Sequence, residues 1–524
     1  MAVERQSAYL PPAQPSYILR GHASQIHSVQ FARQNTRLIT GDADGWIIYW
    51  KLETKRALAV WKAHDGAILG TAAWAHDKII THGRDNNLRI WQIRAADESA
   101  LSTALPAEVP SGDRATPWLL HTLPVNTLNF CAFSACEGIV QGKAQKNENT
   151  IGSARSGFIE DDASVLIAVP ARDDKKAEVY QFPEERLKYV VPRAQSKDTG
   201  MVMALKLVRN STAQQTLVVT GYEGGLTAVH LLPKDDDSVI GIAQLVYLSQ
   251  PHTQPILSLD VSPDAEMYFT SGADAIIAAH RIPDLPSRPE DENLFLRVQD
   301  DEDDPPISIP KPSPEIELQT ASSGTVGGGT KDLPVDDPPI SIPDDTSPGE
   351  PFSFSKRPIA TSVQPGLSSR GAGGLSSLLS NAATPLKTSK TAPPPLLSVQ
   401  APYKVNNTKH AGQQSLSVRS DGRLLVTGGW DSRVRVYSAK TLKEVAVLKW
   451  HKEGVYAVAF AAILVASDLH QVAGKSNSGE TSGEVTNKET GLGKLQRHRE
   501  EKMQVKHWIA AGAKDGKVSL WELF

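Results

Sequence analysis

Apolar and polar residues alternate in short runs along most of the chain, and turn residues separate these runs. The stretch "VTGGWDSRVRVYSAKTLKEVAVLKWH", Val426 to His451, shows the pattern: a Gly-flanked turn around Asp431 precedes an alternating segment. A period of two with turn residues at regular intervals predicts antiparallel β-strands. The chain is therefore expected to be all-β.

The same unit recurs along the chain with fixed spacing. An Asp stands six residues before a Trp, Tyr or His in six copies, and a Thr stands four residues before that Asp in four of them. A seventh copy keeps the shape but has Gly224 in the Asp position. The six pairs are Asp44–Trp50, Asp85–Trp91, Asp174–Tyr180, Asp274–His280, Asp431–Tyr437 and Asp515–Trp521.

A His precedes four of these Asp residues by 21 or 22 positions: His22, His64, His252 and His410. From His22 to His64 is 42 residues, and this period is typical of a β-propeller blade of four strands. The count predicts seven blades, with the third beginning near residue 120. The segment Tyr17–Arg20 stands where an outer strand belongs, so the N-terminal strand is expected to complete the last blade.

The expected organisation is an N-terminal extension (1–16), blades one to five (17–281), an insertion (282–400) and blades six and seven (401–524). The insertion holds 20 of the 35 prolines, so it is expected to be disordered. It contains "DDPPISIP" twice, at 303–310 and 336–343. This doubling indicates either a small tandem duplication in a linker or a doubled peptide motif for a partner's groove.

Two shorter interruptions are expected at about 136–161 and 467–506. The end of the second, "GKLQRHREEKMQ", is expected to form a solvated loop or a short helix. Glu500 and Glu501 offset Arg497 and Arg499, which argues against a nucleic-acid patch there.

Composition and charge narrow the function classes. A net charge of -4 gives no bulk field for nucleic acid or an anionic membrane. The two cysteines, Cys131 and Cys136, are too few for a disulfide scaffold. No signal peptide or membrane-spanning run is recognisable. These features predict a soluble intracellular protein with neither nucleic acid nor membrane as a direct partner.

Candidate chemistry is sparse. "AGKSN" at 473–477 lacks the first Gly of a phosphate-binding loop, because Leu469 occupies that position. His82, beside a Gly in a blade turn, is expected to face solvent. The evenly spaced Asp residues fall in different blades and are interpreted as structural. We therefore expect no enzyme activity, no cofactor, no metal and no small-molecule substrate.

The "RGH" at 20–22 and the Trp-ended strands resemble WD repeats. The resemblance implies a single seven-bladed WD40 β-propeller with a long disordered insertion. It also implies hydrogen-bonded sets of His, Thr, Asp and Trp within blades. Tyr180, His280 and Tyr437 replace the Trp, and Pro170 and Ala511 replace the Thr, so those blades should depend more on packing. The implied structural positions are His22, Thr40, Asp44, Trp50, His64, Thr81, Asp85, Trp91, Asp174, Asp274, Asp431, Asp515 and Trp521.

Several stretches are similar to those of the ASTRA-associated WD-repeat protein family. They include "YILRGH" at 17–22, "GRDNNLRIW" at 83–91, "GGWDSRVRVY" at 428–437 and "AAGAKDGKVSLWELF" at 510–524. The resemblance implies a non-catalytic scaffold of the ASTRA complex, linked to chromatin remodelling and to maturation of phosphatidylinositol-kinase-like kinases. The implied partners are kinase-maturation HEAT-repeat proteins and AAA+ helicases. The implied location is the nucleus, with the cytoplasm as a second.

Two other functions stay open at this stage. One is a WD-repeat adaptor of another assembly, such as a ubiquitin-ligase substrate receptor or a histone-tail reader. The other is a propeller hydrolase, which would need a catalytic cluster at the central channel.

Overall fold

The computed structural model describes residues 13–107, 114–128, 130–138, 164–194, 199–210, 215–234, 239–283, 397–464 and 491–523. The chain divides into two compact units, residues 1–288 with 393–524 and residues 289–392. Every described residue belongs to the first unit. Both copies of "DDPPISIP", and the "AGKSN" segment, lie outside the described residues.

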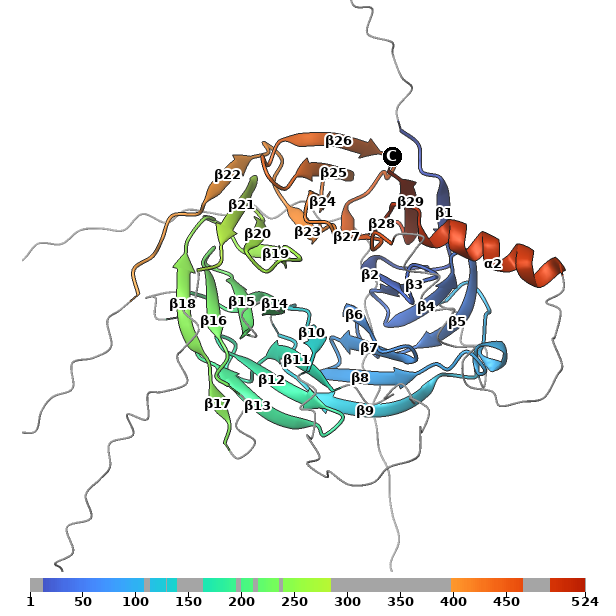
Figure 1. Ribbon diagram of the computed structural model, residues 1–524, viewed down its shortest axis with the longest axis horizontal. Coiled ribbons are helices and arrows are strands. Elements are labelled where there is room, and N and C mark those ends of the chain that lie inside the picture. Colours follow the sequence, from blue (N-terminus) through green and yellow to red (C-terminus); the bar gives the residue numbers. More distant parts are fainter. Residues whose placement is uncertain are drawn as a thin grey trace, which may run out of the picture. The chain divides into compact units, whose positions relative to one another are not determined.

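Seven blades, each with four antiparallel strands, form a closed ring, so the predicted propeller is confirmed (Figure 1). From the inside outward, blade one contains β2 (Ile26–Ala32), β3 (Arg37–Asp42), β4 (Trp46–Lys51) and β5 (Arg56–Lys62). Blade two contains β6 (Ile68–Trp74), β7 (Lys78–Gly83), β8 (Asn87–Gln92) and β9 (Trp118–Pro124). Blade three contains β10 (Ser134–Glu137), β11 (Val165–Pro170), β12 (Ala177–Phe182), β13 (Arg186–Val191) and β17 (Gly241–Ile242).

The remaining blades continue around the ring in chain order. Blade four contains β14 (Val202–Asn210), β15 (Gln215–Tyr222), β16 (Thr227–Leu231) and β18 (Gln244–Ser249), and blade five contains β19 (Ile256–Val261), β20 (Met267–Gly272), β21 (Ile276–Arg281) and β22 (Lys404–Asn407). Blade six contains β23 (Gln413–Val418), β24 (Leu424–Gly429), β25 (Arg433–Ser438) and β26 (Glu444–Lys449). Blade seven contains β27 (Val455–Phe460), β28 (Trp508–Ala513), β29 (Lys517–Glu522) and β1 (Tyr17–Arg20).

The N-terminal strand closes the ring. β1 pairs antiparallel with β29, with Tyr17 opposite Leu520 and Arg20 opposite Lys517. The seventh blade is therefore built from the two ends of the described chain, and the first and last strands of the propeller are neighbours (Figure 1).

Three blade boundaries differ from those expected. β9 forms the outer strand of blade two, so blade three begins at Ser134 rather than near residue 120. β17 lies within the sequence expected for blade four but pairs in parallel with β13 of blade three. β22 completes blade five after the insertion, so the region 401–524 also contributes to that blade. The outer strand carries the weakest repeat signal, which is why the errors gather there.

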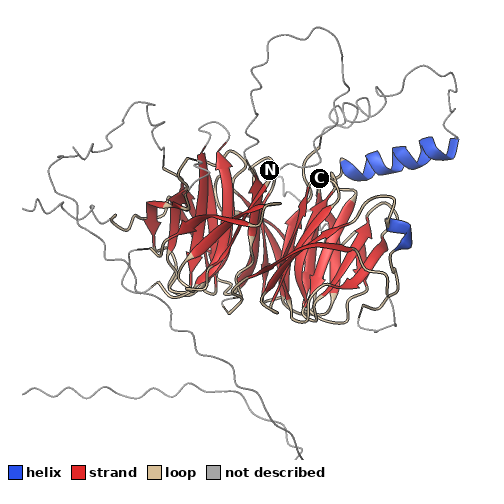
Figure 2. Cartoon of the chain, turned by 90° about the horizontal axis from the view of Figure 1, so that it is seen from below, coloured by secondary structure: helices blue, strands red, loops and turns tan. Residues whose placement is uncertain are grey.

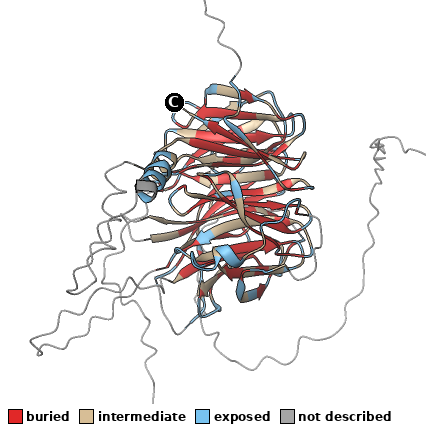
Figure 3. Cartoon of the chain, turned by 90° about the vertical axis from the view of Figure 1, so that its right-hand side faces the viewer, coloured by how far each residue is buried: buried red, intermediate tan, exposed pale blue. Residues whose placement is uncertain are grey.

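Packing between blades follows from a recurrent Gly. The Gly after the recurrent Thr position lies against the first residue of the next inner strand; a Cβ on Gly41 would lie 2.7 Å from the Ile68 side chain. The missing side chain lets the apolar residue of the next blade pack against the sheet. The matching pairs are Gly41–Ile68, Gly221–Ile256, Gly428–Val455 and Gly512–Ile26. Buried residues of neighbouring blades consequently form shared clusters. Figure 3 shows that much of each strand in the ring is buried.

Among the described residues, two elements lie outside the blades, the 3-10 helix η1 (Glu98–Ala100) and the helix α2 (Gly491–Gln504). α2 stands between the first and second strands of blade seven and lies over one face of the ring (Figure 2). At Gly138, Pro283 and Leu464 the chain leaves the described residues for its three longest internal segments outside them, each time after the first or third strand of a blade. Because antiparallel strands alternate in direction, these three exits are on the same face as α2.

Candidate functional site

The predicted polar set of blade two is assembled in full. His64 follows β5, Thr81 lies on β7 and Trp91 lies on β8. The His64 ring contacts Asp85 through Nδ1 at 2.8 Å and Thr81 Oγ1 through Nε2 at 2.8 Å. Trp91 Nε1 donates to Thr81 Oγ1 at 2.9 Å. Four residues from separate segments therefore satisfy one another inside the blade.

Blade one uses a different Asp from the expected one. His22 Nδ1 contacts Asp42 at 2.7 Å and Nε2 contacts Thr40 at 2.7 Å, whereas Asp44 is exposed and its N–H donates to Asp42. Trp50 Nε1 donates to Thr40 at 2.9 Å. Residues two apart on a strand share a face, so Thr40 and Asp42 reach the same ring. The assignment of Asp44 is therefore corrected to Asp42.

A Gly explains why blade two uses the later Asp. In blade two the position that corresponds to Asp42 is Gly83, where a Cβ would lie 2.3 Å from the His64 ring. The ring of His64 thus lies over the Gly and contacts Asp85 beyond it. Blades two, five and six have Gly at the position of Asp42. This difference in the sequence could have identified Asp42 as the partner of His22.

Blade five assembles the set with a His in the Trp position. His252 contacts Asp274 and Thr270, both at 2.9 Å. His280 Nε2 lies 3.4 Å from Thr270 Oγ1, where blades one and two have the indole N–H, and its ring stacks on Tyr268. The substitution of Trp by His therefore keeps the polar contact.

Blade seven rebuilds the set around a hydroxyl from the adjacent strand. Ser519 Oγ lies 2.7 Å from His451 Nε2 and accepts from Trp521 Nε1 at 2.8 Å. Ser519 lies opposite Ala511, the residue that replaces the Thr. Asp515 is farther from the ring, at 3.7 Å from Nδ1, and pairs with Lys517 at 2.9 Å.

Blade six replaces the His with an amide. Thr427 Oγ1 donates to the Gln413 side chain at 2.6 Å, and His410 is exposed. Asp431 forms a bidentate salt bridge with the buried Arg435, with distances of 3.0 and 2.6 Å. Asp431 therefore neutralises a buried guanidinium, and the sequence pattern did not identify Gln413 or Arg435.

Blades three and four have no comparable set among the described residues. Asp174 is half-buried and has no described side-chain hydrogen bond, and His121 lies on β9 of blade two, where it pairs with Glu185 at 2.5 Å. In blade four, His230 occupies the Trp position and is buried with neither ring nitrogen bonded among the described residues. These blades depend on packing.

Burial lowers the pKa of two His rings in blade two. Burial lowers the pKa of His64, against the opposing effect of Asp85. Burial alone would raise the pKa of Asp85, but the charge and hydrogen bond of His64 lower it overall. His82 is fully buried, so the expectation that it faces solvent is wrong, and burial lowers its pKa to about 3. It lies edge-on to Phe133 and stays neutral at physiological pH.

The chemistry that remains is limited. Burial raises the pKa of the Cys131 thiol far above its usual range and that of Cys136 to about 12, so neither forms a thiolate readily. Within the described ranges, no three His, Cys, Asp or Glu side chains stand where they could hold a metal ion. No helix of these ranges is long and apolar enough to cross a membrane. The polar sets hold blades together.

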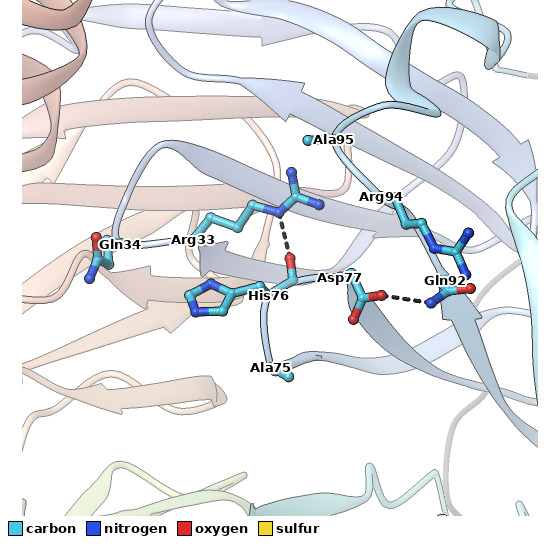
Figure 4. Close-up of a pocket in the computed structure, with 8 residues that line it drawn as sticks. All are labelled: Arg33, Gln34, Ala75, His76, Asp77, Gln92, Arg94 and Ala95. Carbon is cyan, nitrogen blue, oxygen red and sulfur yellow. Dashed lines mark hydrogen bonds between the residues drawn. The ribbon is translucent and has the colours of Figure 1, made fainter. Parts of the chain in front are cut away.

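A surface groove of about 830 Å³ lies between blades one and two (Figure 4). Two tight loops contribute to its lining, and in these loops Arg33, Gln34, Asn35 and Ala75 all have positive φ angles, between 47° and 63°. Each such residue costs on the order of 1 kcal/mol. The Arg33 guanidinium offsets this cost by donating to the carbonyls of His76 and Ile93 and to Glu98, all within 2.6–2.8 Å.

Asn35 makes the corresponding contacts toward blade seven. Its side-chain NH₂ donates to the carbonyls of Ala462 and Gln504, and its Oδ1 accepts from the Ala462 N–H at 2.9 Å. These two residues stand at the beginning and end of the interruption of blade seven. The loop 33–35 therefore joins blade one to both of its neighbours on the face that carries α2.

Comparison with known proteins gives a consistent result along the chain. The sequence profile described as "ASA1: ASTRA-associated protein 1" matches residues 15–521. The ASTRA-associated protein 1 of Pyricularia oryzae is 38% identical over 517 residues, 98% of each chain. That of Aspergillus niger is 35% identical over the full length of both chains, and that of Schizosaccharomyces pombe is 26% identical over 85% of this chain and 93% of its own.

The match covers all seven blades, and the resemblance noted in the sequence is confirmed. With its propeller fold and the profile match from residue 15 to residue 521, the chain belongs to the ASTRA-associated protein 1 family.

Proposed function

We propose that this protein is a non-catalytic WD-repeat scaffold subunit of the ASTRA complex. In this role it contributes to chromatin remodelling and to the maturation of phosphatidylinositol-kinase-like kinases. Its partners would be kinase-maturation HEAT-repeat proteins and AAA+ helicases, and its location would be the nucleus, with the cytoplasm as a second. The observation that carries the proposal is the full-length similarity to proteins named ASTRA-associated protein 1.

The geometry supports a scaffold rather than an enzyme. The His–Thr–Asp sets stand in different blades and are directed into them, so they cannot converge on one substrate. Propellers present broad loop surfaces, and here the described exits to three long segments share one of them. A rigid ring that displays such a surface is suited to holding other proteins.

Affinity purification of the tagged chain from nuclear extract, followed by mass spectrometry, tests the proposal. We expect large HEAT-repeat proteins and AAA+ helicases to be retained. A parallel purification with a chain that lacks residues 290–392 separates binding by the ring from binding by the insertion. Retention of ligase components or histones in place of these proteins would favour the alternative, a WD-repeat adaptor of another assembly.

A further inference from the structure

A second groove follows the seam where the ring closes. It has a volume of about 490 Å³, and the whole of strand β1, Tyr17–Arg20, lines one side. The other side is formed by Trp50, by Lys55 in the turn before β5, by Arg56 and Ala57 at the start of β5, and by Thr103 and Leu105. We call this the seam groove. It lies between the outer strand of blade seven and blade one.

The charge of the seam groove is positive and unbalanced. Arg20 and Arg56 are exposed, Lys55 is half-buried, and no carboxylate lines the groove or pairs with them among the described residues. The nearby Glu53 pairs with Lys51 at 3.1 Å. Lys55 lies over the Tyr17 ring, 5.4 Å from its centroid, which holds the ammonium group in the groove. Three neighbouring cations without counter-charges attract anionic groups.

The helix α2 lies near the turn that precedes β5. Glu500 of α2 pairs with Lys51 at 3.1 Å, so the helix lies beside the turn that leads into the seam groove. Arg499 and Lys502 are exposed on the helix.

The backbone and the apolar side chains point to an extended ligand. β1 is the edge of its sheet and has only β29 as a neighbour there among the described strands. An edge strand presents main-chain N–H and C=O groups that can pair with an added strand. Tyr17 and Leu105 are 41% and 42% exposed at the groove and offer apolar contacts. A short extended peptide matches these features.

We propose that the seam groove binds an extended acidic segment of a partner protein. The segment adds as a strand to the edge of β1, its carboxylates pair with Arg20, Lys55 and Arg56, and an apolar side chain packs on Tyr17 and Leu105. A nucleic acid fits less well, because apolar side chains interrupt the cations and the chain carries a net charge of -4. The inference rests on the groove alone and goes beyond the proposed function.

Fluorescence anisotropy with the full-length protein tests this inference. The probe is a labelled peptide of about nine residues with alternating Glu and Val, long enough to span the edge of β1, and the control peptide has Lys in place of Glu. We expect the acidic peptide to bind at least about tenfold more tightly. The double substitution Arg20→Glu with Arg56→Glu should weaken binding at least about tenfold. Arg94→Glu, at an exposed Arg of blade two outside the groove, should change binding less than about twofold.

Hydrogen–deuterium exchange of the unaltered protein provides the second readout. Addition of the acidic peptide should protect the amides of residues 17–20, and this measurement remains decisive if the double variant does not fold. Equal affinity for both peptides, unchanged affinity of the double variant, or binding without protection of β1 would overturn the proposal. A single-stranded oligonucleotide that binds these residues as tightly as the peptide would overturn it in favour of a nucleic-acid site.

Discussion

Blades one, two and five differ from blades three and four in the interactions that stabilise their strands. In the first group a buried His contacts an Asp and a Thr of the same blade, with distances of 2.7–2.9 Å. In the second group the described residues form no such set, and apolar clusters take its place. Both groups share the same core of antiparallel strands, so the polar sets specify the geometry of a blade without being required for it.

The largest effect should come from breaking a fully buried pair. Asp42→Ala removes the partner of His22 and leaves the buried ring and the N–H of Trp46 without an acceptor. We expect a loss of about 3–5 kcal/mol in the free energy of unfolding, measured by chemical denaturation. Asp44→Ala is the matched control and should change it by less than about 0.5 kcal/mol. A larger loss for Asp44→Ala than for Asp42→Ala would show that Asp44 is the partner of His22, as the sequence predicted.

Asp85→Ala should have a smaller effect, because its side chain is 11% exposed and water can replace part of the interaction. We expect a loss of about 1–3 kcal/mol, since His64 and Arg89 lose their shared partner. Asp174→Ala in blade three is the comparison and should be nearly neutral. Equal losses in the two variants would show that blade three has a polar set after all.

Acidic pH should destabilise the ring through its buried imidazoles. Burial lowers the pKa of His82, His230 and His280 to about 3, 4 and 3, below the ordinary value of 6.5. The unfolded chain therefore binds protons below about pH 6.5 while the folded chain does not. Their contribution to stability is complete above about pH 6.5 and is lost as the pH falls toward about 3.

His82→Leu should reduce this sensitivity, because it removes one titrating ring. Between about pH 7.5 and 5.5 the loss of stability should be smaller by about 1 kcal/mol than in the unaltered protein. His498→Leu, at an exposed position of α2, should leave the pH dependence unchanged. Equal pH dependence of all three proteins would mean that His82 is not buried in solution.

The smallest effect should follow from deleting residues 290–392 within blade five. The buried clusters of the described ring draw on residues outside this range, so the melting temperature should change little. A longer deletion through Gln400 should cost about 1 kcal/mol. It removes Leu397, which packs against the cluster of blades three and four, and the hydrogen bond from Gln400 to Leu248. A large loss in the shorter variant would assign a structural role to the insertion.

Fold prediction succeeded where the signal is local. The fixed distance from Asp to the aromatic residue reflects a tight turn and a paired strand, so the number of blades and the closing strand could be predicted from spacing. The outer strands could not, because β9 and β22 follow segments of irregular length. The polar sets were predicted where Thr81 and Asp85 keep their spacing. They failed where a partner comes from another strand, as with Ser519, or where a different side chain fills the place, as with Gln413.

The pairing of β1 with β29 also sets an order of events during synthesis. Residues 17–20 leave the ribosome almost five hundred residues before their partners at 517–520. Until then the chain is an open arc, with the edge of β29 absent and the inner strand of blade one lacking a neighbour on one side. Exposed strand edges of this kind promote aggregation, so the interval before closure is when the nascent chain most needs a chaperone.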